Sequence, residues 1–261
     1  MSIWHLLLYQ PLVNGLIFFY QLLGQNLGLA IIVLTLAIRT ALYPLTKPSL
    51  EAAKKMRAIA PQLEKLKKKH KNDKQALAQA QLKLYQKNGI KPGAGCLPQI
   101  VQILILIALF QAFRQVLTDN GQVIEKLNSV LYPVLQLPKE TVINTKFAYL
   151  NLTQPDLINL PFKIKILNFV IDKIPGLFLL AAAAVQFLTS RLMIGQTLVV
   201  QQKAKETPQQ EDDMAAMMQK QMLYMMPLMT LLVGFQFASG LVLYWITFSL
   251  FMFFQQLVMQ K

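Results

Sequence analysis

The chain has 261 residues, of which 54% are hydrophobic and only 15% are charged, and its formal net charge is +14. Soluble globular proteins carry roughly a quarter charged residues, so this composition excludes an ordinary soluble domain and favours a membrane protein. The single cysteine, Cys96, excludes an intramolecular disulfide and a multi-cysteine metal site. His5 and His70 lie far apart, so we expect neither a metal ion nor a cofactor.

The chain opens with an apolar run, Ile3 to Leu23, which Gln10, Asn14 and Gln21 interrupt. Such a run is compatible with a membrane span or with an amphipathic helix that lies in the membrane interface. We favour an external interfacial helix over residues 1–25, because its apolar stretch is repeatedly broken by polar residues. No basic segment precedes the run and no small-residue cleavage site follows it, so a removable signal peptide is not expected.

Later apolar runs approach the length of about 20 residues that a membrane-spanning helix needs. They predict five transmembrane helices, at residues 26–45, 96–117, 176–194, 221–237 and 239–258. The segments that connect them are 46–95, 118–175 and 195–220. The expected fold class is therefore an all-α, polytopic membrane protein.

The distribution of charge predicts the orientation. Of the 26 Lys and Arg residues, 13 lie between Lys47 and Lys91 against three acidic residues, so segment 46–95 carries 13 − 3 = +10 of the net charge. Cytoplasmic loops are enriched in Lys and Arg, which places this segment in the cytoplasm. The first 38 residues carry no Lys, Arg, Asp or Glu, and the near-neutral segment 118–175 has six lysines and five acidic residues. We expect a plasma-membrane protein with an external N-terminus, an external segment 118–175 and a cytoplasmic C-terminus.

Segment 46–95 is predicted to form a helical hairpin, because apolar residues recur at helical spacing on both sides of "HKNDK". Asp73 can cap the second helix and Gly89 can end it, whereas Pro61 predicts a kink or a restart in the first. The lysine-rich "KLKKKHK", residues 65–71, suits anionic lipids or ribosomal RNA. A solvated helix face that only obeys the orientation rule is the alternative. The sequence offers no reason to expect sequence-specific nucleic-acid binding.

Arg39 stands within the first predicted span. All 12 Asp and Glu residues lie outside the predicted spans, so Arg39 has no acidic partner within them. Placing an arginine at the centre of a membrane helix costs ~2.5–3.5 kcal/mol on insertion scales. Either its side chain snorkels to the cytoplasmic head groups, or it lines a wet cavity that receives an acidic segment. The other polar or amphipathic candidates for such a cavity are Thr35, Gln99, Gln102, Gln186, Gln236, Tyr244 and Trp245.

Each of these candidates has a plainer interpretation. Single glutamines can be hydrogen-bonded glue between helices, worth about 0.6 kcal/mol each, and Tyr244 with Trp245 can belong to an interfacial aromatic belt. A cavity with one fixed positive charge and no carboxylate is a poor proton relay. The chain also has no nucleophile elbow, no phosphate-binding glycine loop and no paired intramembrane carboxylates, so we predict that it is not an enzyme.

Several segments together resemble the YidC/Oxa/Alb family of membrane protein insertases, from about Pro11 to Gln256. They are "LAIIVLTLAIRTALYPLTKP", "APQLEKL", "DKQALAQAQLKLYQKNGIKP", "GCLPQIVQ" and "MMPLMTLLVGFQFASGLVLYW". The resemblance implies five core helices around a hydrophilic groove that is closed to the outside and open to the cytoplasm and to lipid. Departures from the family pattern include Ala238, which stands where members often have proline, and the length of segment 118–175.

Carried over by position, the resemblance makes Arg39 the groove arginine, Thr35 its polar neighbour, Gln102 a groove-lining residue and Trp245 a substrate contact. It implies an insertase and chaperone for nascent membrane proteins with short acidic extramembrane segments. Anionic lipids, the ribosome and a Sec translocon are the further candidate partners, through the basic hairpin. Two alternatives remain: an anion or small-molecule transporter that binds its substrate at Arg39, and a non-inserting assembly subunit of a translocon.

Overall fold

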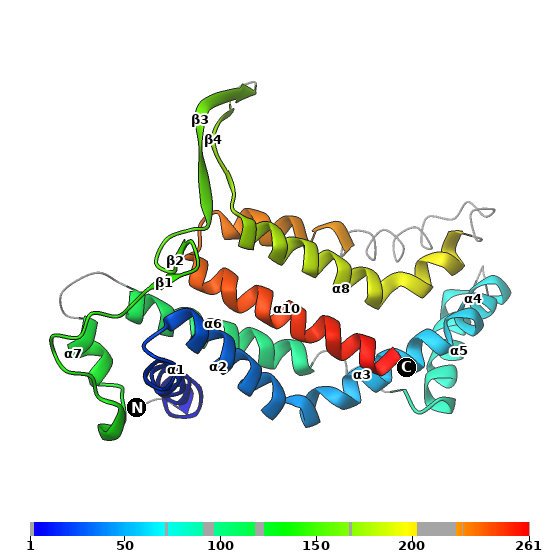
Figure 1. Cartoon of the computed structure of the whole chain (residues 1–261). Coiled ribbons are helices and arrows are strands. Elements are labelled where there is room, and N and C mark those ends of the chain that lie inside the picture. The colour runs from blue at the N-terminus through cyan, green and yellow to red at the C-terminus, as the bar shows by residue number, and fades with distance from the viewer. Residues whose placement is uncertain are drawn as a thin grey trace.

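The computed structural model describes residues 3–70, 73–90, 97–117, 123–166, 169–202, 223–225 and 227–260. These residues are mostly helical, and the long helices lie side by side across Figure 1. One end of the bundle carries α7 and four strands, and the other carries α4 and α5 (Figure 1). We call these ends the strand end and the lysine end.

The bundle consists of long apolar helices, with α1 crossing them at the strand end. Their bounds are α1 (Gln10–Leu22, after the π-helical turn η1, His5–Tyr9), α2 (Leu27–Ala41), α6 (Leu97–Leu117), α8 (Leu177–Gln202) and α10 (Ser239–Gln260). A short apolar helix, Leu223–Gly234, precedes α10. In Figure 1, α10 lies between α8 on one side and α2 on the other, and it packs against both.

Within the described residues, α10 is long and apolar enough to cross a membrane by itself, over Ser239–Val258. Helix α2 passes the same test only together with α3, from which it is bent by 65°. Ile100–Phe113, Leu177–Leu192 and Leu223–Gly234 are shorter apolar helices. The expectation of a mostly helical protein is therefore confirmed and the long apolar helix is consistent with a membrane protein, while five spans and their orientation stay predictions. Residues 203–222, with most of loop 195–220 and the start of the predicted span 221–237, lie outside the described residues.

The lysine end has the local structure that the sequence predicts. It is built from α3 (Tyr43–Ala58), α4 (Ala60–Lys69) and α5 (Lys74–Lys87). The Asp73 side chain accepts a hydrogen bond from the Ala76 amide at 2.9 Å and so caps α5. Gly89 adopts a φ of +61°, the left-handed conformation that favours glycine after a helix. The helix restarts as α4 just before Pro61. Proline is tolerated there because the backbone N–H groups in the first turn of a helix have no partner within the helix.

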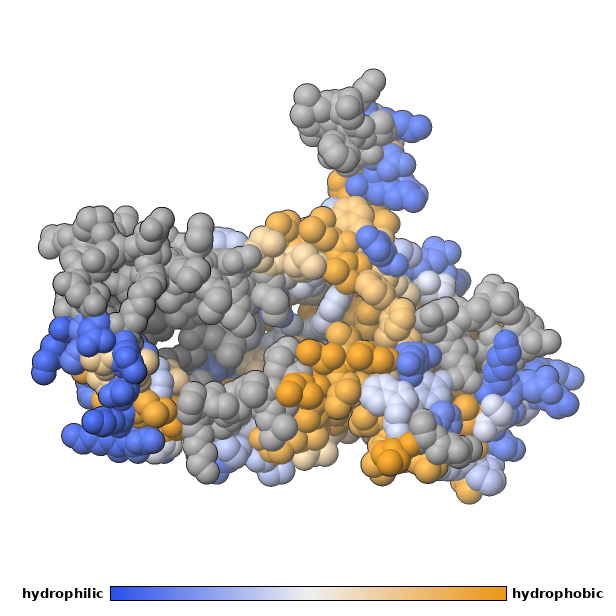
Figure 2. All heavy atoms as spheres, turned by 180° about the vertical axis from the view of Figure 1, so that it is seen from behind, coloured by the Kyte–Doolittle hydropathy of each residue, from blue (hydrophilic) through white to orange (hydrophobic). Residues whose placement is uncertain are grey.

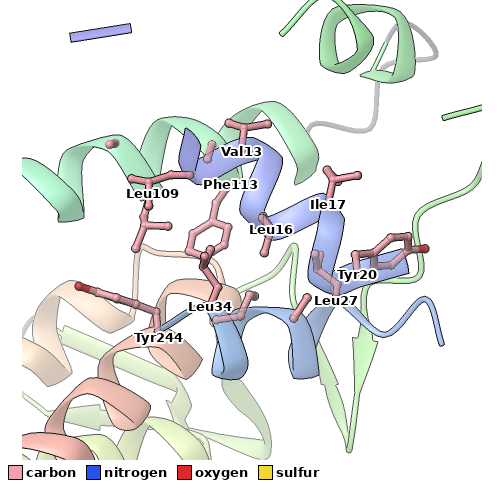
Figure 3. Close-up of a cluster of buried hydrophobic side chains, with 14 of the residues drawn as sticks. Val13, Leu16, Ile17, Tyr20, Leu27, Leu34, Leu109, Phe113 and Tyr244 are labelled. Atoms are coloured by element: carbon pink, nitrogen blue, oxygen red, sulfur yellow. The ribbon is translucent and has the colours of Figure 1, made fainter. Parts of the chain in front are cut away.

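Helix α1 runs across the bundle and not along it. It is seen end-on in Figure 1, whereas α2, α8 and α10 are seen from the side. One face of α1 packs between α2 and α6 (Figure 3), and its buried residues are Leu12, Val13, Asn14, Leu16, Ile17 and Tyr20. Phe18 and Leu22 on other faces remain exposed. This crossing direction is what an interfacial helix requires, although the interfacial position itself stays a prediction.

The strand end contains regular structure that the sequence analysis missed. Segment 123–175 forms α7 (Val123–Asn128), a 3₁₀ turn η3 (Pro133–Leu135) and four strands, β1 (Lys146–Phe147), β2 (Leu150–Asn151), β3 (Leu157–Ile166) and β4 (Phe169–Pro175). The strands pair as two antiparallel hairpins, β1 with β2 and β3 with β4. The expectation of an all-α protein is thus wrong for this segment. The β3–β4 hairpin stands out from the bundle, across the direction of its helices (Figure 1).

The segment between β1 and β3 closes over the strand end of α2 and α10. The Ser239 amide donates to the Gln154 carbonyl at 2.7 Å, and the Gly240 amide donates to the Leu152 carbonyl at 3.1 Å. A Cβ on Gly28, at the start of α2, would collide with the ring of Phe147. These helix starts are therefore fixed to the same strand pair by backbone hydrogen bonds and close packing.

Asp156 fixes the start of α8 to the same segment. Its carboxylate is buried and accepts hydrogen bonds from the Leu179 amide and the Tyr149 hydroxyl, each at 2.8 Å. An acidic side chain is favourable at this position, because the N-terminal end of a helix carries a partial positive charge. Gly176 leaves room for the carboxylate, since a Cβ there would collide with Asp156 Oδ1.

Candidate functional site

Arg39 is held inside the bundle by three helices. Its Nη2 donates a hydrogen bond to Gln102 Oε1 on α6 at 2.5 Å, and its guanidinium carbon lies 3.7 Å from the centre of the Phe248 ring on α10. Gln102 Nε2 in turn donates to the Tyr244 hydroxyl at 2.5 Å. Arg39 is 8% exposed and Tyr244 only 2%. We call these four residues the arginine network.

The positions of these side chains follow from helix geometry. Tyr244 and Phe248 are four residues apart on α10, so their side chains lie on one face, and that face packs toward α2. Tyr244 belongs to the apolar cluster that includes Leu34 and Leu109, and its hydroxyl points away from the other members (Figure 3). The hydroxyl therefore contacts the amide of Gln102 and not an apolar side chain.

The network explains how a buried arginine is tolerated without an acid. A hydrogen bond to a charged group contributes ~1.5–3 kcal/mol, and a desolvated cation–π contact contributes up to ~2 kcal/mol or more. Together they are large enough to offset the ~2.5–3.5 kcal/mol that an arginine costs at the centre of a membrane helix. Within the described part of the chain, Arg39 makes no ion pair with a carboxylate. Its positive charge is stabilised by neutral groups and is not cancelled.

The snorkelling interpretation of Arg39 is not supported by these contacts. A snorkelling side chain extends along its own helix toward the head groups. The Arg39 side chain instead extends sideways to α6 and α10, where Gln102 and Phe248 hold it.

The other predicted site residues separate into two groups. Thr35 is buried one turn before Arg39, but its hydroxyl donates to the Ile31 carbonyl at 2.6 Å, within α2. Gln186 accepts a hydrogen bond from Ser249 at 3.0 Å and so joins α8 to α10. Gln236 is exposed in the turn before α10. Among the predicted polar candidates whose side chains the structure describes, only Gln102 and Tyr244 contact Arg39 or each other in the arginine network.

Two further candidates are less defined by contacts. Trp245 is half-buried on α10 beside Tyr244 and packs against the main apolar cluster. The backbone of Gln99 lies in the first turn of α6, but its side chain is outside the described part of the structure. Its predicted role is therefore untested.

Phe248 is the member of the network that the sequence analysis missed. A phenylalanine in an apolar span is indistinguishable from a packing or lipid-facing residue when read alone. The usable signal was its spacing of four residues from Tyr244, which places both rings on one face of α10. Across the described residues, no group of three or more His, Cys, Asp or Glu side chains is arranged to hold a metal ion.

The helices and the arginine network define the class of this protein: a mostly helical membrane protein with a fixed positive charge inside its bundle. The family model described as "60Kd inner membrane protein" matches residues 18–261. The chain belongs to this family, which is the YidC/Oxa/Alb family that its sequence motifs resemble.

Individual relatives agree with this assignment. The chain is 29% identical to a "Membrane protein insertase YidC" of Geobacter sulfurreducens, over 97% of this chain and 37% of that protein. It is 30% identical to a protein of the same name from Oceanobacillus iheyensis, over 91% of this chain and 76% of that one. It is 32% identical to "Membrane protein insertase YidC 2" of Bacillus anthracis, over 96% and 78%. The chain thus spans well under half of the Geobacter relative.

Proposed function

We propose that this chain is a membrane protein insertase that moves short, acidic extramembrane segments of nascent clients outward. The observation that carries the proposal is the arginine network, in which Arg39 is buried and its partners among the described residues are neutral groups. Family membership and the names of the relatives support the same activity.

The energetics of the network suit transient binding of a client carboxylate. An arginine and a carboxylate at 4 Å attract by ~4 kcal/mol at an effective dielectric of 20. To bind it, Arg39 gives up part of its hydrogen bond to Gln102 and its contact with Phe248, which together are worth a similar amount. The exchange is nearly balanced, so a client segment can be captured and then released.

The reaction needs no covalent step and therefore no catalytic residue. The driving force is the transfer of the client's hydrophobic helix into lipid, at roughly 25 cal/mol per Å² of apolar surface removed from water. The insertase lowers the free-energy barrier to moving the client's polar flank across the membrane. It does so in a groove lined by Arg39, Gln102, Tyr244 and Trp245. The membrane potential adds ~2.3 kcal/mol per 100 mV for each negative charge carried fully outward.

In this proposal the lysine end faces the cytoplasm and the strand end faces outward, in a multi-pass plasma-membrane topology. The excess of Lys and Arg in segment 46–95 supports that orientation. Helices α4 and α5 then lie where anionic lipids, a ribosome or a Sec translocon can meet them. The crossing direction of α1 supports its place in the outer interface.

The proposal can be tested by site-specific photo-crosslinking during translation of a single-spanning client with an acidic N-terminal tail. A crosslinker at Trp245 should capture the acidic client, and Arg39→Ala should reduce that capture. A client whose tail acids are replaced by glutamine is the matched control, and its capture should respond little to Arg39→Ala. A crosslinker at Phe254, which is 61% exposed on the same helix, controls for contact from surrounding lipid.

Two results would count against the insertase. Absence of adducts at Trp245 for several clients, with full complementation by Arg39→Ala in cells depleted of their own insertase, would refute the role of the arginine network. Flux of a defined small anion into vesicles that depends on Arg39 would identify a transporter instead. Adducts without any transfer of the client tail across the membrane would indicate a non-inserting assembly subunit.

A further inference from the structure

The β3–β4 hairpin is the largest feature of the strand end that the insertase mechanism does not use. Residues 157–175 contain 11 hydrophobic residues, three lysines and one aspartate. The hairpin projects from the bundle and has no other element of the described chain packed along it (Figure 1). An isolated two-stranded hairpin is at best marginally stable in water. We therefore expect this apolar hairpin to be stabilised by contact with another surface.

The base of the hairpin has an apolar face and a polar face. Ile158 and Ile174 stand opposite each other and are 48% and 38% exposed. The next pair, Asn159 and Lys173, is polar, and it points to the other side because successive side chains in a strand alternate. Farther along β3, Lys163 is also exposed.

The edges of the hairpin are poorly suited to pairing with another strand. Pro161 removes a backbone donor from β3, and the register shifts between Asn159 and Ile164. Prolines, irregular registers and lysines are the devices by which proteins block the addition of strands at a sheet edge. A partner is therefore expected to contact the face of the hairpin and not its edge.

The direction of the hairpin indicates which surface it meets. It extends across the axes of α2, α8 and α10, from the same end of the bundle as the crossing helix α1 (Figure 1). If the bundle axes cross the membrane, as the proposed function requires, the hairpin runs parallel to the membrane plane near its outer surface. Figure 2 shows hydrophobic side chains of the bundle reaching up to the base of the hairpin.

We infer that the β3–β4 hairpin rests on the outer leaflet of the lipid bilayer, with Ile158 and Ile174 toward the lipid. Its lysines lie within about a Debye length of the surface and are attracted to anionic head groups without resting on them. The net charge of residues 157–175 is +2, from three lysines and one aspartate, which complements an anionic surface. The hairpin would thereby fix the tilt of α8, to which β4 leads directly through Gly176. This inference rests on the proposed orientation, but not on the activity of the arginine network.

The test uses the full chain in nanodiscs, in a Cys96→Ser background with one cysteine introduced as Ile158→Cys and labelled with an environment-sensitive fluorophore. Brominated phosphatidylcholine serves as the quencher, with or without phosphatidylglycerol. The matched control is Glu140→Cys, an exposed position of the strand end outside the hairpin. We expect quenching at position 158 to exceed that at 140 by about twofold or more, and to increase with anionic lipid.

Charge reversal tests the attraction of the hairpin lysines to anionic head groups. Lys163→Glu combined with Lys173→Glu should remove the effect of phosphatidylglycerol on quenching at position 158. The same change at Lys139 and Lys146, which are exposed at this end but outside the hairpin, should leave it unchanged. Equal quenching with and without phosphatidylglycerol would overturn the assignment to anionic head groups.

Other outcomes separate this inference from the insertase proposal. Water-like emission at position 158 in every lipid would overturn the placement on lipid. Disulfide-linked dimers of the unlabelled Ile158→Cys protein, without quenching in the labelled protein, would also overturn it and would identify a second copy as the partner. Client crosslinking by the same labelled protein is measured in parallel. Quenching at position 158 with failed client capture would support the hairpin placement and refute only the insertase.

Discussion

Arg39 and Gln102 are 63 positions apart in the chain, yet their side chains share a hydrogen bond of 2.5 Å between α2 and α6. The amide of Gln102 can serve Arg39 only through its oxygen, because a guanidinium has donors and no acceptor. That choice leaves Nε2 free to donate to Tyr244 on α10. One neutral side chain thus joins three helices around a charge that it does not neutralise.

Replacing Gln102 by glutamate should separate stability from function. A fixed carboxylate beside Arg39 would compete with a client carboxylate by ~4 kcal/mol, so Gln102→Glu should lower insertion of an acidic client by about tenfold or more. It should not lower thermal stability, since both neighbours can donate to a carboxylate. Insertion is measured by protease protection of the client tail in proteoliposomes.

The control for this prediction is Gln102→Leu. It leaves Arg39 and the Tyr244 hydroxyl without their partner, and should lower the free energy of unfolding by ~1–3 kcal/mol. Wild-type insertion by Gln102→Glu would contradict the competition on which the prediction rests.

Phe248 should contribute to stability through its contact with Arg39. Phe248→Leu keeps an apolar side chain but removes the ring face, and should cost ~1–2 kcal/mol from the lost cation–π contact and imperfect repacking. Thermal unfolding in detergent micelles measures the change. Phe254→Leu, at an exposed position of the same helix, should have little effect, and equal losses in the two variants would rule out a special role of Phe248.

Asp156 should hold the first turn of α8 in place. Asp156→Ala removes the acceptor of the Leu179 amide and should cost ~1–2 kcal/mol, as loss of a helix cap does. Hydrogen exchange should become faster at Leu179 in this variant. Gly176→Ala should act in the same direction because its Cβ displaces the carboxylate. The control is Asp172→Ala, which removes an exposed carboxylate and should leave hydrogen exchange at Leu179 unchanged. Unchanged exchange at Leu179 in Asp156→Ala would contradict the capping role of Asp156.

The close approach of Gly28 and Phe147 should appear as a coupling between two substitutions. Gly28→Ala alone should cost ~1–3 kcal/mol, because its Cβ collides with the Phe147 ring. In a Phe147→Ala background the same change should cost less, since the ring is gone. A double-mutant cycle on thermal unfolding gives the coupling, and strictly additive losses would show that the two residues do not meet.

The titration of Tyr149 gives a prediction for alkaline pH. Burial raises the pKa of Tyr149 above its ordinary value of 10.0; the hydrogen bond from the Phe178 amide opposes this increase, and the hydrogen bond and charge of Asp156 add to it. A raised pKa in the folded state contributes stability that is present below about pH 10 and is lost as pH rises through the folded pKa. Tyr149→Phe should remove a late-titrating phenol from the ultraviolet difference spectrum. Loss of an early-titrating phenol instead would mean that the shift has the opposite sign.

Features that depend on near neighbours in the chain could be predicted from the sequence. Asp73 caps α5 and Gly89 ends it as expected, because a cap requires only a side chain and a backbone amide three residues away. Pro61 marks the restart of the helix for an equally local reason. The strands of segment 123–175 were missed, because short antiparallel pairs depend on a register that composition does not specify.

The sequence by itself determined that this chain is a helical membrane protein with an arginine, Arg39, in its first predicted span and no acid in any predicted span. Those conclusions need only counting and position, since the cost of a charge in lipid does not depend on the fold. Tertiary structure alone decided which neutral groups satisfy Arg39, because Gln102, Tyr244 and Phe248 come from helices far apart in the chain. It also separated Gln186 and Gln236 from that site, since the same residue type can join two helices, face solvent or hold a charge, according to what packs against it.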